Sequence, residues 1–367
     1  MQNNFKSRAV ASGITFIALA SLAACGGGGD DAAPAVPAST ASPAAPAAPA
    51  PVVNLTTVSP ADAQRLTGRA VSSLGFAASS ASSSAQLYTT ATTTSAASGS
   101  APCPLGGTAA YSRVDADNNG RVTAGDMVTL TGSNCRFSQS GITGSLDGSL
   151  SASVLAVTGT PYAGSNWRLS VVQTNTALTA VANGQSVSLN GAVQIDASPT
   201  DPFASPFEFT GQFDFRARFD NLSVRNGASG GFTNLVSGEI TSRATREAPP
   251  APAPVPSPAP GAPPTPAPAP IPATTLRVGF SNLNLQTQLV PGQTVNVTIN
   301  TSGTGLGFGG GNQLLSGSAT VTTGSIRLIV TALGANQVRL DTDNNSDGVI
   351  DATQTLTWTA LTAAGNL

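Results

Sequence analysis

The stretch Phe207-Glu-Phe-Thr-Gly-Gln-Phe-Asp-Phe-Arg-Ala-Arg-Phe219 alternates between apolar and polar residues at almost every step. A period of two places the two sets of side chains on opposite faces of a β-strand. One apolar and one polar face are typical of an antiparallel sheet that covers a core on one side. After Phe219 the alternation changes phase, because the next apolar positions are Leu222 and Val224. The same change follows Phe280, and both changes lie in a Phe-x-Asn-Leu sequence. This predicts a β-bulge at equivalent places in two related units.

A short motif of an aliphatic residue, a small polar residue and glycine recurs along the chain and indicates a repeat. Each copy is followed by a strand, a loop and a triplet in which arginine stands between two apolar residues. The motifs begin at Leu146, Leu189, Val236 and Leu315, and the triplets are centred on Arg168, Arg216, Arg277 and Arg327. We interpret these segments as four related hairpins. Coincidence within a low-complexity β sequence is the alternative.

These patterns predict an all-β fold for residues 101–367, a large antiparallel meander that forms a rolled sheet or half-barrel. Two β-sandwich-like domains are the alternative, divided at the Pro-rich run of residues 248–273. The repeat favours one domain, because two of the other hairpins also carry proline in the equivalent connection. The run is then an enlarged hairpin loop, whereas an interdomain linker would be expected between two domains.

One short N-terminal helix is predicted over residues 60–76. Ser59-Pro60-Ala61-Asp62 supplies an N-cap serine, a proline at the first helical position and an acid in the first turn. The following apolar residues share one helical face, which we expect to pack on the dry face of the sheet: Leu66, Ala70, Val71 and Leu74. Residues 77–100 are rich in serine, threonine and alanine and are predicted to be a poorly ordered linker.

The N-terminus has the plan of a secretory signal over residues 1–24, with a basic start, an apolar run and small residues at its end. The tetrapeptide Leu22-Ala23-Ala24-Cys25 resembles the lipobox of bacterial lipoproteins. In that family the chain is cleaved before the cysteine, which is then acylated, and several acyl chains on one residue anchor stably. The resemblance implies lipidation of Cys25, and Gly26 after it implies the outer membrane. An ordinary signal peptide that contains a cysteine is the alternative.

Residues 25–59 are rich in glycine, alanine and proline and cannot form a core. We interpret them as a tether between the lipid anchor and the folded part. The reach of this tether lies between about 30 Å for a flexible coil and about 100 Å for an extended polyproline helix. The membrane is therefore the one partner that the sequence predicts, and any protein partner stays unknown.

Composition excludes several classes of function. Cleavage before Cys25 would remove two of the 16 basic residues, Lys6 and Arg8, so that 14 arginines face 18 acids with a net charge of −4. This charge predicts no nucleic-acid partner. The mature chain would contain neither histidine nor lysine, and it therefore lacks a Ser-His-Asp triad, the usual zinc ligands and a Schiff-base residue. We predict that it is not an enzyme, although a pair of carboxylates such as Glu208 and Glu239 stays open.

Two cysteines remain besides Cys25, and an even pair in an oxidising compartment predicts a disulfide between Cys103 and Cys135. It would close a loop of about 33 residues, worth roughly 3–4 kcal/mol on the chain-entropy account. Two free buried thiols are the alternative.

Two Asp-rich segments have the spacing of calcium-binding loops, so that calcium is the candidate cofactor. The first loop offers Asp115, Asp117, Asn119, the backbone carbonyl of Arg121 and Asp126. The second loop offers Asp343, Asn345, Asp347, the backbone carbonyl of Val349 and Asp351. The second loop matches the early positions of the calcium-loop pattern better than the first loop does. Its last position is Gln354, which cannot supply the bidentate carboxylate expected there. Both are flanked by β-like sequence, unlike the helices of an EF-hand, and turns that bind no metal are the alternative.

The C-terminal Asp-rich loop followed by Thr357-Trp358-Thr-Ala-Leu361 resembles a group of uncharacterised proteobacterial envelope lipoproteins. The resemblance covers residues 101–155 and 310–361 and implies no activity. We predict a non-enzymatic envelope lipoprotein with a structural or binding role on the outer membrane. A periplasmic carrier of an apolar ligand in a half-barrel is the alternative. A filled concave face would favour the first role and an enclosed apolar pocket the second.

Overall fold

The structure is a computed structural model of the chain. It describes residues 52–93, 97–139, 142–161, 166–182, 185–199, 213–226, 231–246, 274–290, 293–309, 314–334 and 336–365. The first half of the stretch that predicted the sheet, residues 207–212, lies outside these ranges, as do residues 1–51 and 248–273.

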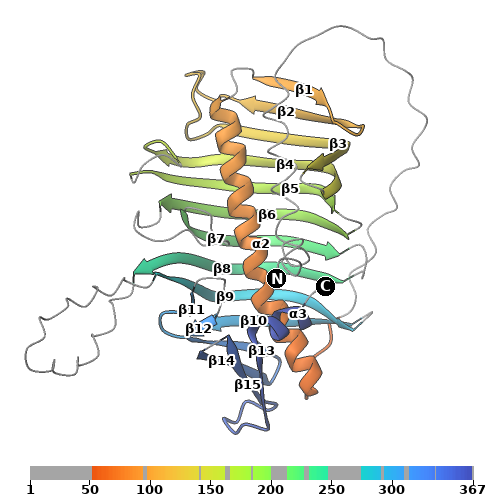
Figure 1. The fold of residues 1–367 in the computed structure, drawn as a ribbon, viewed down its shortest axis with the longest axis vertical. Coiled ribbons are helices and arrows are strands. Elements are labelled where there is room, and N and C mark those ends of the chain that lie inside the picture. The colour runs from red at the N-terminus through yellow and green to blue at the C-terminus, as the bar shows by residue number, and fades with distance from the viewer. Residues whose placement is uncertain are drawn as a thin grey trace, which may run out of the picture.

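The described strands form one antiparallel sheet of 16 strands, in which almost every strand pairs with its neighbours in the chain (Figure 1). The strands are β1 Ser98–Pro102, β2 Thr108–Val114, β3 Met127–Gln139, β4 Ile142–Thr158, β5 Arg168–Ala182, β6 Gln185–Pro199, β7 Phe213–Asn226, β8 Phe232–Arg246, β9 Thr274–Val290, β10 Gln293–Thr301, β11 Leu306–Phe308, β12 Leu314–Ser316, β13 Ser318–Thr323, β14 Ile326–Gly334, β15 Gln337–Asp343 and β16 Ala352–Thr357. The two shortest, β11 and β12, leave the main path and pair with each other, and β11 also pairs with β9. The predicted all-β meander is therefore confirmed.

A single continuous sheet replaces the alternative of two β-sandwich-like domains. The pairing of β8 with β9 continues up to Arg246 opposite Thr274. Residues 247–273 therefore connect two strands that are hydrogen-bonded neighbours in one sheet, which an interdomain linker would not do.

The predicted change of phase occurs in both strands. In β7 the buried side chains are Phe215, Ala217 and Phe219, followed by Leu222 and Val224. In β9 the same change separates Phe280 from Leu283, and both are buried. The residue that absorbs each shift is an asparagine with positive φ, Asn221 at 52° and Asn282 at 45°. Both predicted bulges are confirmed.

The aliphatic-polar-glycine motif is one half of a coupled pair of backbone irregularities. Its glycine adopts a positive φ and lies so close to a neighbouring segment that a Cβ would overlap a carbonyl oxygen there. The pairs are Gly148 with Ala177, Gly191 with Asn221, Gly238 with Asn282 and Gly317 with Gly305. Each of these partners also has positive φ. Only glycine fits such a position, because it has no Cβ. The motif recurs for this reason, and its irregularities lie side by side on successive strands.

The polar residue of the motif accepts a hydrogen bond from the strand on the side opposite to the glycine contact. Asp147 accepts a hydrogen bond from the backbone N–H of Asn134 in β3, and Asn190 accepts one from Ala177 in β5 at 3.3 Å. Asn300 of β10, which lies outside the motif, accepts in the same way from the N–H of Asn282, at 2.7 Å. Bulges free backbone donors from the ladder, and these side chains satisfy them. Bulges also bend strands, so a row of them across many strands curves the whole sheet into a gutter.

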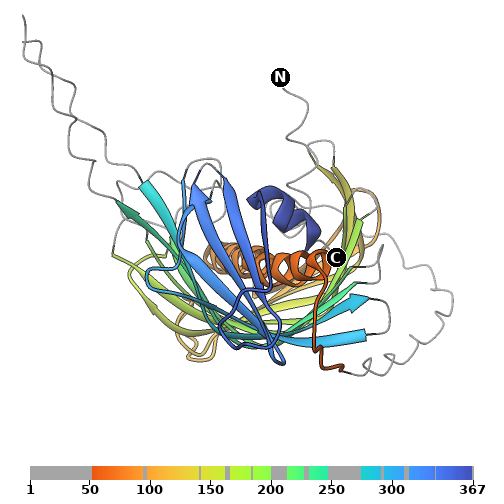
Figure 2. The ribbon, with the colours of Figure 1, turned by 90° about the horizontal axis from the view of Figure 1, so that it is seen from below.

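Helix α2, Pro60–Thr93, lies inside this gutter and runs across the strands (Figures 1 and 2). The expected start is present, since Ser59 Oγ accepts from the N–H of Asp62 at 3.1 Å. The expected end at residue 76 is wrong, because the helix continues through most of the stretch predicted to be a linker. Its 34 residues span about 51 Å at 1.5 Å per residue. The ten steps from β3 to β15 span about 48 Å at 4.8 Å each, so the helix matches the sheet that it crosses.

Burial explains why a Ser/Thr/Ala-rich sequence is helical here. Serine and threonine are poor helix formers in isolation because their hydroxyls compete for the backbone. In α2 several hydroxyls bond back to helical carbonyls, as Ser73 does to Ala70 and Ser83 to Ser79. Small side chains also let the helix lie close to the sheet. The buried residues of this half are Ala77, Ala78, Ser80, Ala81, Ser82, Ser83, Ser84, Leu87, Tyr88 and Ala91.

The second described helix, α3, spans Trp358–Ala364 and packs on α2. Thr357 caps it by accepting from the N–H of Ala360, and Trp358 and Leu361 are buried. Trp358 meets Phe308 of β11 edge to face, with ring centroids 5.4 Å apart. The Thr-Trp-x-x-Leu ending is therefore a capped helix that closes one end of the core.

Candidate functional site

The first Asp-rich loop connects β2 to β3 and brings three carboxylates together. Oxygens of Asp115, Asp117 and Asp126 lie within 4.8 Å of one another. Asp115 is partly exposed, Asp117 is exposed and Asp126 is fully buried. The hydroxyl of Thr123 lies 3.2 Å from Asp117 Oδ2 and adds a fourth oxygen. This is an oxygen-rich group of the kind that a hard cation such as calcium prefers.

Backbone donors hold the loop in shape. Asp115 accepts from the N–H groups of Asn119 and Gly120, at 3.1 and 2.7 Å, and Asp126 accepts from Ala116 and Thr123, at 2.9 and 2.7 Å. The N–H of Arg121 donates to Asn119 Oδ1 at 2.7 Å. All five predicted ligand residues therefore belong to one hydrogen-bonded loop.

The charge of Asp115 is favoured by its surroundings. Partial desolvation raises the pKa of this carboxyl, but the hydrogen bonds from the N–H groups of Gly120 and Asn119 and the charge of Arg113 bring it below its usual 3.8. Arg113 lies 3.9 Å from Asp115. An ionised carboxylate at neutral pH is the form that ligates a cation.

The second Asp-rich loop, between β15 and β16, is organised differently. Asp343 is fully buried and accepts from the N–H of Gly348 at 3.1 Å while pairing with Arg327 at 3.1 Å. Asp351 accepts from the N–H of Asn344 at 2.7 Å. Asn345 and Asp347 bond to each other at 2.9 Å, and the N–H of Val349 donates to Asp347 at 2.8 Å. Within the described ranges no trio of carboxylates forms here, so the geometry favours the first loop, opposite to the ranking by sequence.

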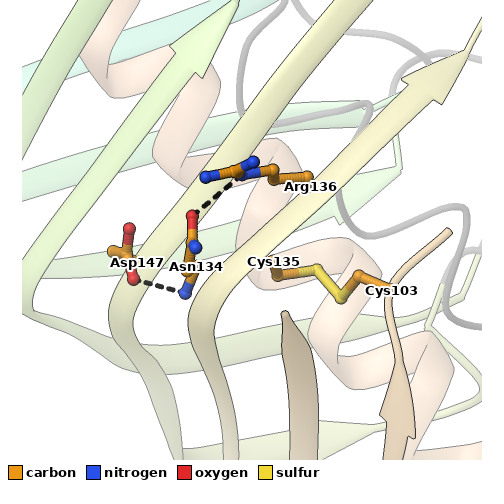
Figure 3. Close-up of a disulfide and its surroundings, with 5 residues drawn as sticks. All are labelled: Cys103, Asn134, Cys135, Arg136 and Asp147. Carbon is orange, nitrogen blue, oxygen red and sulfur yellow. Dashed lines mark hydrogen bonds between the residues drawn. A yellow bond between two sulfur atoms is a disulfide. The ribbon is translucent and has the colours of Figure 1, made fainter. Parts of the chain in front are cut away.

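Cys103 and Cys135 form the predicted disulfide, with Cα atoms 5.3 Å apart (Figure 3). Cys135 directly follows Asn134, the bulge residue that bonds to Asp147 and also accepts from Arg136 (Figure 3). The segment after Cys103 is pinned to the same place, since Gly106 accepts from the N–H of Arg136 at 2.9 Å. The disulfide therefore fastens the start of the sheet to its first bulge.

The lipobox and Cys25 lie outside the described residues. The first described residue is Val52, which pairs with Thr294 of β10 in the part of the sheet that carries the C-terminal strands. Val53 donates its N–H to the carbonyl of Thr294 at 2.8 Å, and Val58 donates to Asn344 Oδ1 at 3.0 Å. Among the described residues, no helix combines the length and the apolar character that crossing a membrane requires.

The concave face of the sheet is the place where a half-barrel would hold an apolar ligand. Here α2 occupies it, in contact with every strand from β3 to β10. Beneath the helix lies a buried polar group that the sequence did not single out. Ser84 donates to Gln173 at 2.8 Å, and Gln173 donates to Asn175 at 3.3 Å. Gln173 and Asn175 continue the alternation of the buried Leu169 and Val171 in β5, so the period of two alone would have placed them on the inward face.

The convex face carries cross-strand ion pairs. Arg216 pairs with Glu239 and Arg218 with Asp196. Glu239 is thus neutralised by a neighbour, and its candidate partner Glu208 lies outside the described residues.

Compared with known proteins, the chain matches no protein-family model, no curated protein and no solved structure.

Proposed function

We propose that the protein is a non-enzymatic lipoprotein of the bacterial outer membrane with a structural or binding role. The observation that carries the proposal is the filled gutter: the groove that could hold an apolar ligand is occupied along its length by α2. Buried residues occur along the helix from Ala63 to Ala91, so its inner face belongs to the core. A sheet with its concave face filled leaves its convex face, edges and loops for contact with partners.

The anchor is supported by the lipobox and by the way the chain enters the fold at one end. Cys25→Ser should release the protein from the membrane without unfolding the sheet. Fractionation of the host, together with the mass of the N-terminal peptide, tests this. Acyl chains on Cys25 and a soluble variant are the expected results, and a variant that stays in the detergent-soluble membrane fraction would contradict the anchor.

The carrier of an apolar ligand is the second candidate, and the buried polar group of Ser84, Gln173 and Asn175 opposes it. A greasy ligand that displaced α2 would leave these hydrogen-bonding groups facing an apolar molecule, which costs free energy. Native mass spectrometry of the delipidated protein, purified from its host, separates the two roles. A bound lipid that is retained through purification would support the carrier.

We also propose that the first loop binds calcium through Asp115, Asp117, Asn119, Asp126 and the carbonyl of Arg121. The convergence of three carboxylates supports this, because such a group repels itself unless a cation offsets the charge. Extracellular sites of this kind bind with dissociation constants of about 10⁻⁴–10⁻³ M. Calorimetric titration of the metal-free protein with calcium, beside magnesium, measures this directly.

A further inference from the structure

The tip of the second Asp-rich loop exposes two large apolar side chains. Val349 is 64% exposed and Ile350 is 40% exposed. Val349 is the most exposed of the large hydrophobic residues in the part of the chain that the structure describes. The two residues are adjacent in the chain, and contiguous apolar surface, unlike a single exposed side chain, marks places where a protein meets an apolar partner.

The loop holds these side chains outward by construction. The backbone N–H of Gly348 donates to Asp343, that of Asn344 donates to Asp351, and these two hydrogen bonds close the base of the loop. The hydroxyl of Ser346 also donates to the carbonyl of Ser325 at 2.7 Å. Asp343 is itself buried and paired with the half-exposed Arg327, so folding the tip inward would break an ion pair and leave a buried carboxylate without its partner. The exposure of Val349 and Ile350 is therefore a fixed feature of the fold.

The chain from the lipid anchor arrives at this same loop. Val58, the second residue before α2, donates to Asn344 of the loop at 3.0 Å. From there α2 runs away along the gutter toward β1 at the opposite end of the sheet (Figure 1). The described chain thus enters the fold along β10, where Val53 bonds to Thr294, and then passes the loop before α2 begins.

We propose that Val349 and Ile350 insert into the surface of the bilayer that holds the lipid anchor, so that the half-barrel stands on the membrane with this end down. The proposal rests on the proposed lipidation of Cys25. The loop from Asp343 to Asp351 contains three aspartates and no basic residue, which favours zwitterionic over anionic headgroups. The contact is a second, weaker attachment to the membrane in addition to the acyl chains, and it fixes the orientation of the domain.

Spin labels on the lipidated full-length protein in vesicles of phosphatidylcholine and phosphatidylethanolamine test the contact. Because Cys103 and Cys135 are bonded and Cys25 is consumed by acylation, Val349→Cys introduces a single free thiol. Leu333→Cys is the matched control, since Leu333 is 49% exposed but lies at the other end of the β14–β15 hairpin. We expect the label at position 349 to collide several-fold more with oxygen and several-fold less with a water-soluble nickel complex than the label at 333.

A second variant checks that the apolar tip is responsible. A spin label at Ile350→Cys should show the same high accessibility to oxygen and low accessibility to the nickel complex. Adding Val349→Asp to this variant should reverse both accessibilities, because the label then lies in water. Failure of the lipidated protein to float with vesicles would overturn the anchor and this contact together. Flotation with equal accessibility at 349 and 333 would overturn the contact alone. Shielding of position 349 from both reagents would indicate a protein contact and would also overturn it.

Discussion

Gly68 of α2 and Gly365, which follows α3, meet backbone to backbone: a Cβ placed on Gly68 would lie 2.6 Å from the amide nitrogen of Gly365. The same Cβ would overlap the carbonyl oxygen of Leu361. The two helices can therefore approach this closely only because both positions lack a side chain. Through this contact the end of the chain is fastened to the helix that fills the gutter.

Gly68→Ala provides a test in which two effects have opposite signs. In an open helix, alanine would stabilise by about 0.8–1.0 kcal/mol relative to glycine. Here we expect a loss of about 3 kcal/mol, because the added methyl group meets rigid backbone. Urea unfolding measures the change, and the fluorescence of Trp358 reports whether α3 leaves its place. A more stable variant would mean that the helices do not touch at this point.

The coupled bulges predict that the free energy of unfolding depends strongly on the glycine at one position, Gly191. Gly191, at a φ of +116°, lies against the carbonyl of Asn221, whereas Gly106, at +110°, has nothing within 4 Å of its added Cβ. Alanine at either position pays about 1–3 kcal/mol for the backbone conformation. Gly191→Ala should lose about 1–3 kcal/mol more, because it also clashes. Equal losses in thermal or urea unfolding would show that the strands are not in close contact there.

The Pro-rich run is predicted to be dispensable for folding. Since Arg246 and Thr274 are directly opposite in neighbouring strands, a short turn can replace residues 248–273 without moving either strand. Loop shortening of this kind changes the closure entropy only slowly with length. We expect cooperative thermal unfolding with a midpoint at or above that of the parent protein. Two separate transitions, or none, in the deletion variant would contradict the single sheet.

Cys103→Ser with Cys135→Ser should destabilise the protein by roughly 3–4 kcal/mol, as expected for a loop of about 33 residues on the chain-entropy account. Opening should be local at first, because β1 and β2 lie at the edge of the sheet. Hydrogen exchange of β2 compared with β14 is the appropriate measurement. Uniform loss of protection across both strands would argue against local opening.

The sheet could be predicted from the sequence because its cause is local. The alternation from Phe213 onward, the phase change at Asn221 and the recurring glycine motif each follow from the geometry of a single strand or hairpin. The helix after residue 76 could not be found in this way. Its stability comes from burial against strands that lie far away in the sequence, and residues such as Ser80 and Ser84 have no helical preference of their own.

The geometry favours the first of the two Asp-rich loops, against the ranking by sequence, for a similar reason. The spacing in the second loop is better, but Arg327, 16 residues upstream, is placed beside Asp343 by the pairing of β14 with β15. A cation from another strand thus neutralises the carboxylate on which a metal site would depend. In the first loop Arg113 lies 3.9 Å from Asp115, and among the described residues Asp117 and Asp126 have no ion pair.

Calcium should therefore stabilise the protein through the first loop. With a dissociation constant of about 10⁻⁴–10⁻³ M, about 10 mM calcium would add roughly 1.4–2.7 kcal/mol to the free energy of unfolding. Asp117→Asn should remove most of this gain, because it deletes the charge of an exposed ligand without disturbing the buried Asp126. Asp347→Asn is the matched control: it makes the same change in an exposed aspartate of the second loop and should leave the calcium response intact.

Thermal melts in excess EDTA and in 10 mM calcium, with magnesium as a control (a range set by the affinity expected of such sites), give the comparison. We expect the midpoint of the wild type and of Asp347→Asn to rise with calcium and that of Asp117→Asn to rise little. Without metal, Asp117→Asn should be as stable as the wild type or slightly more so, because it relieves repulsion among three carboxylates. An equal response to calcium in both variants would exclude the first loop, and loss of the response in Asp347→Asn alone would restore the order that the sequence predicted.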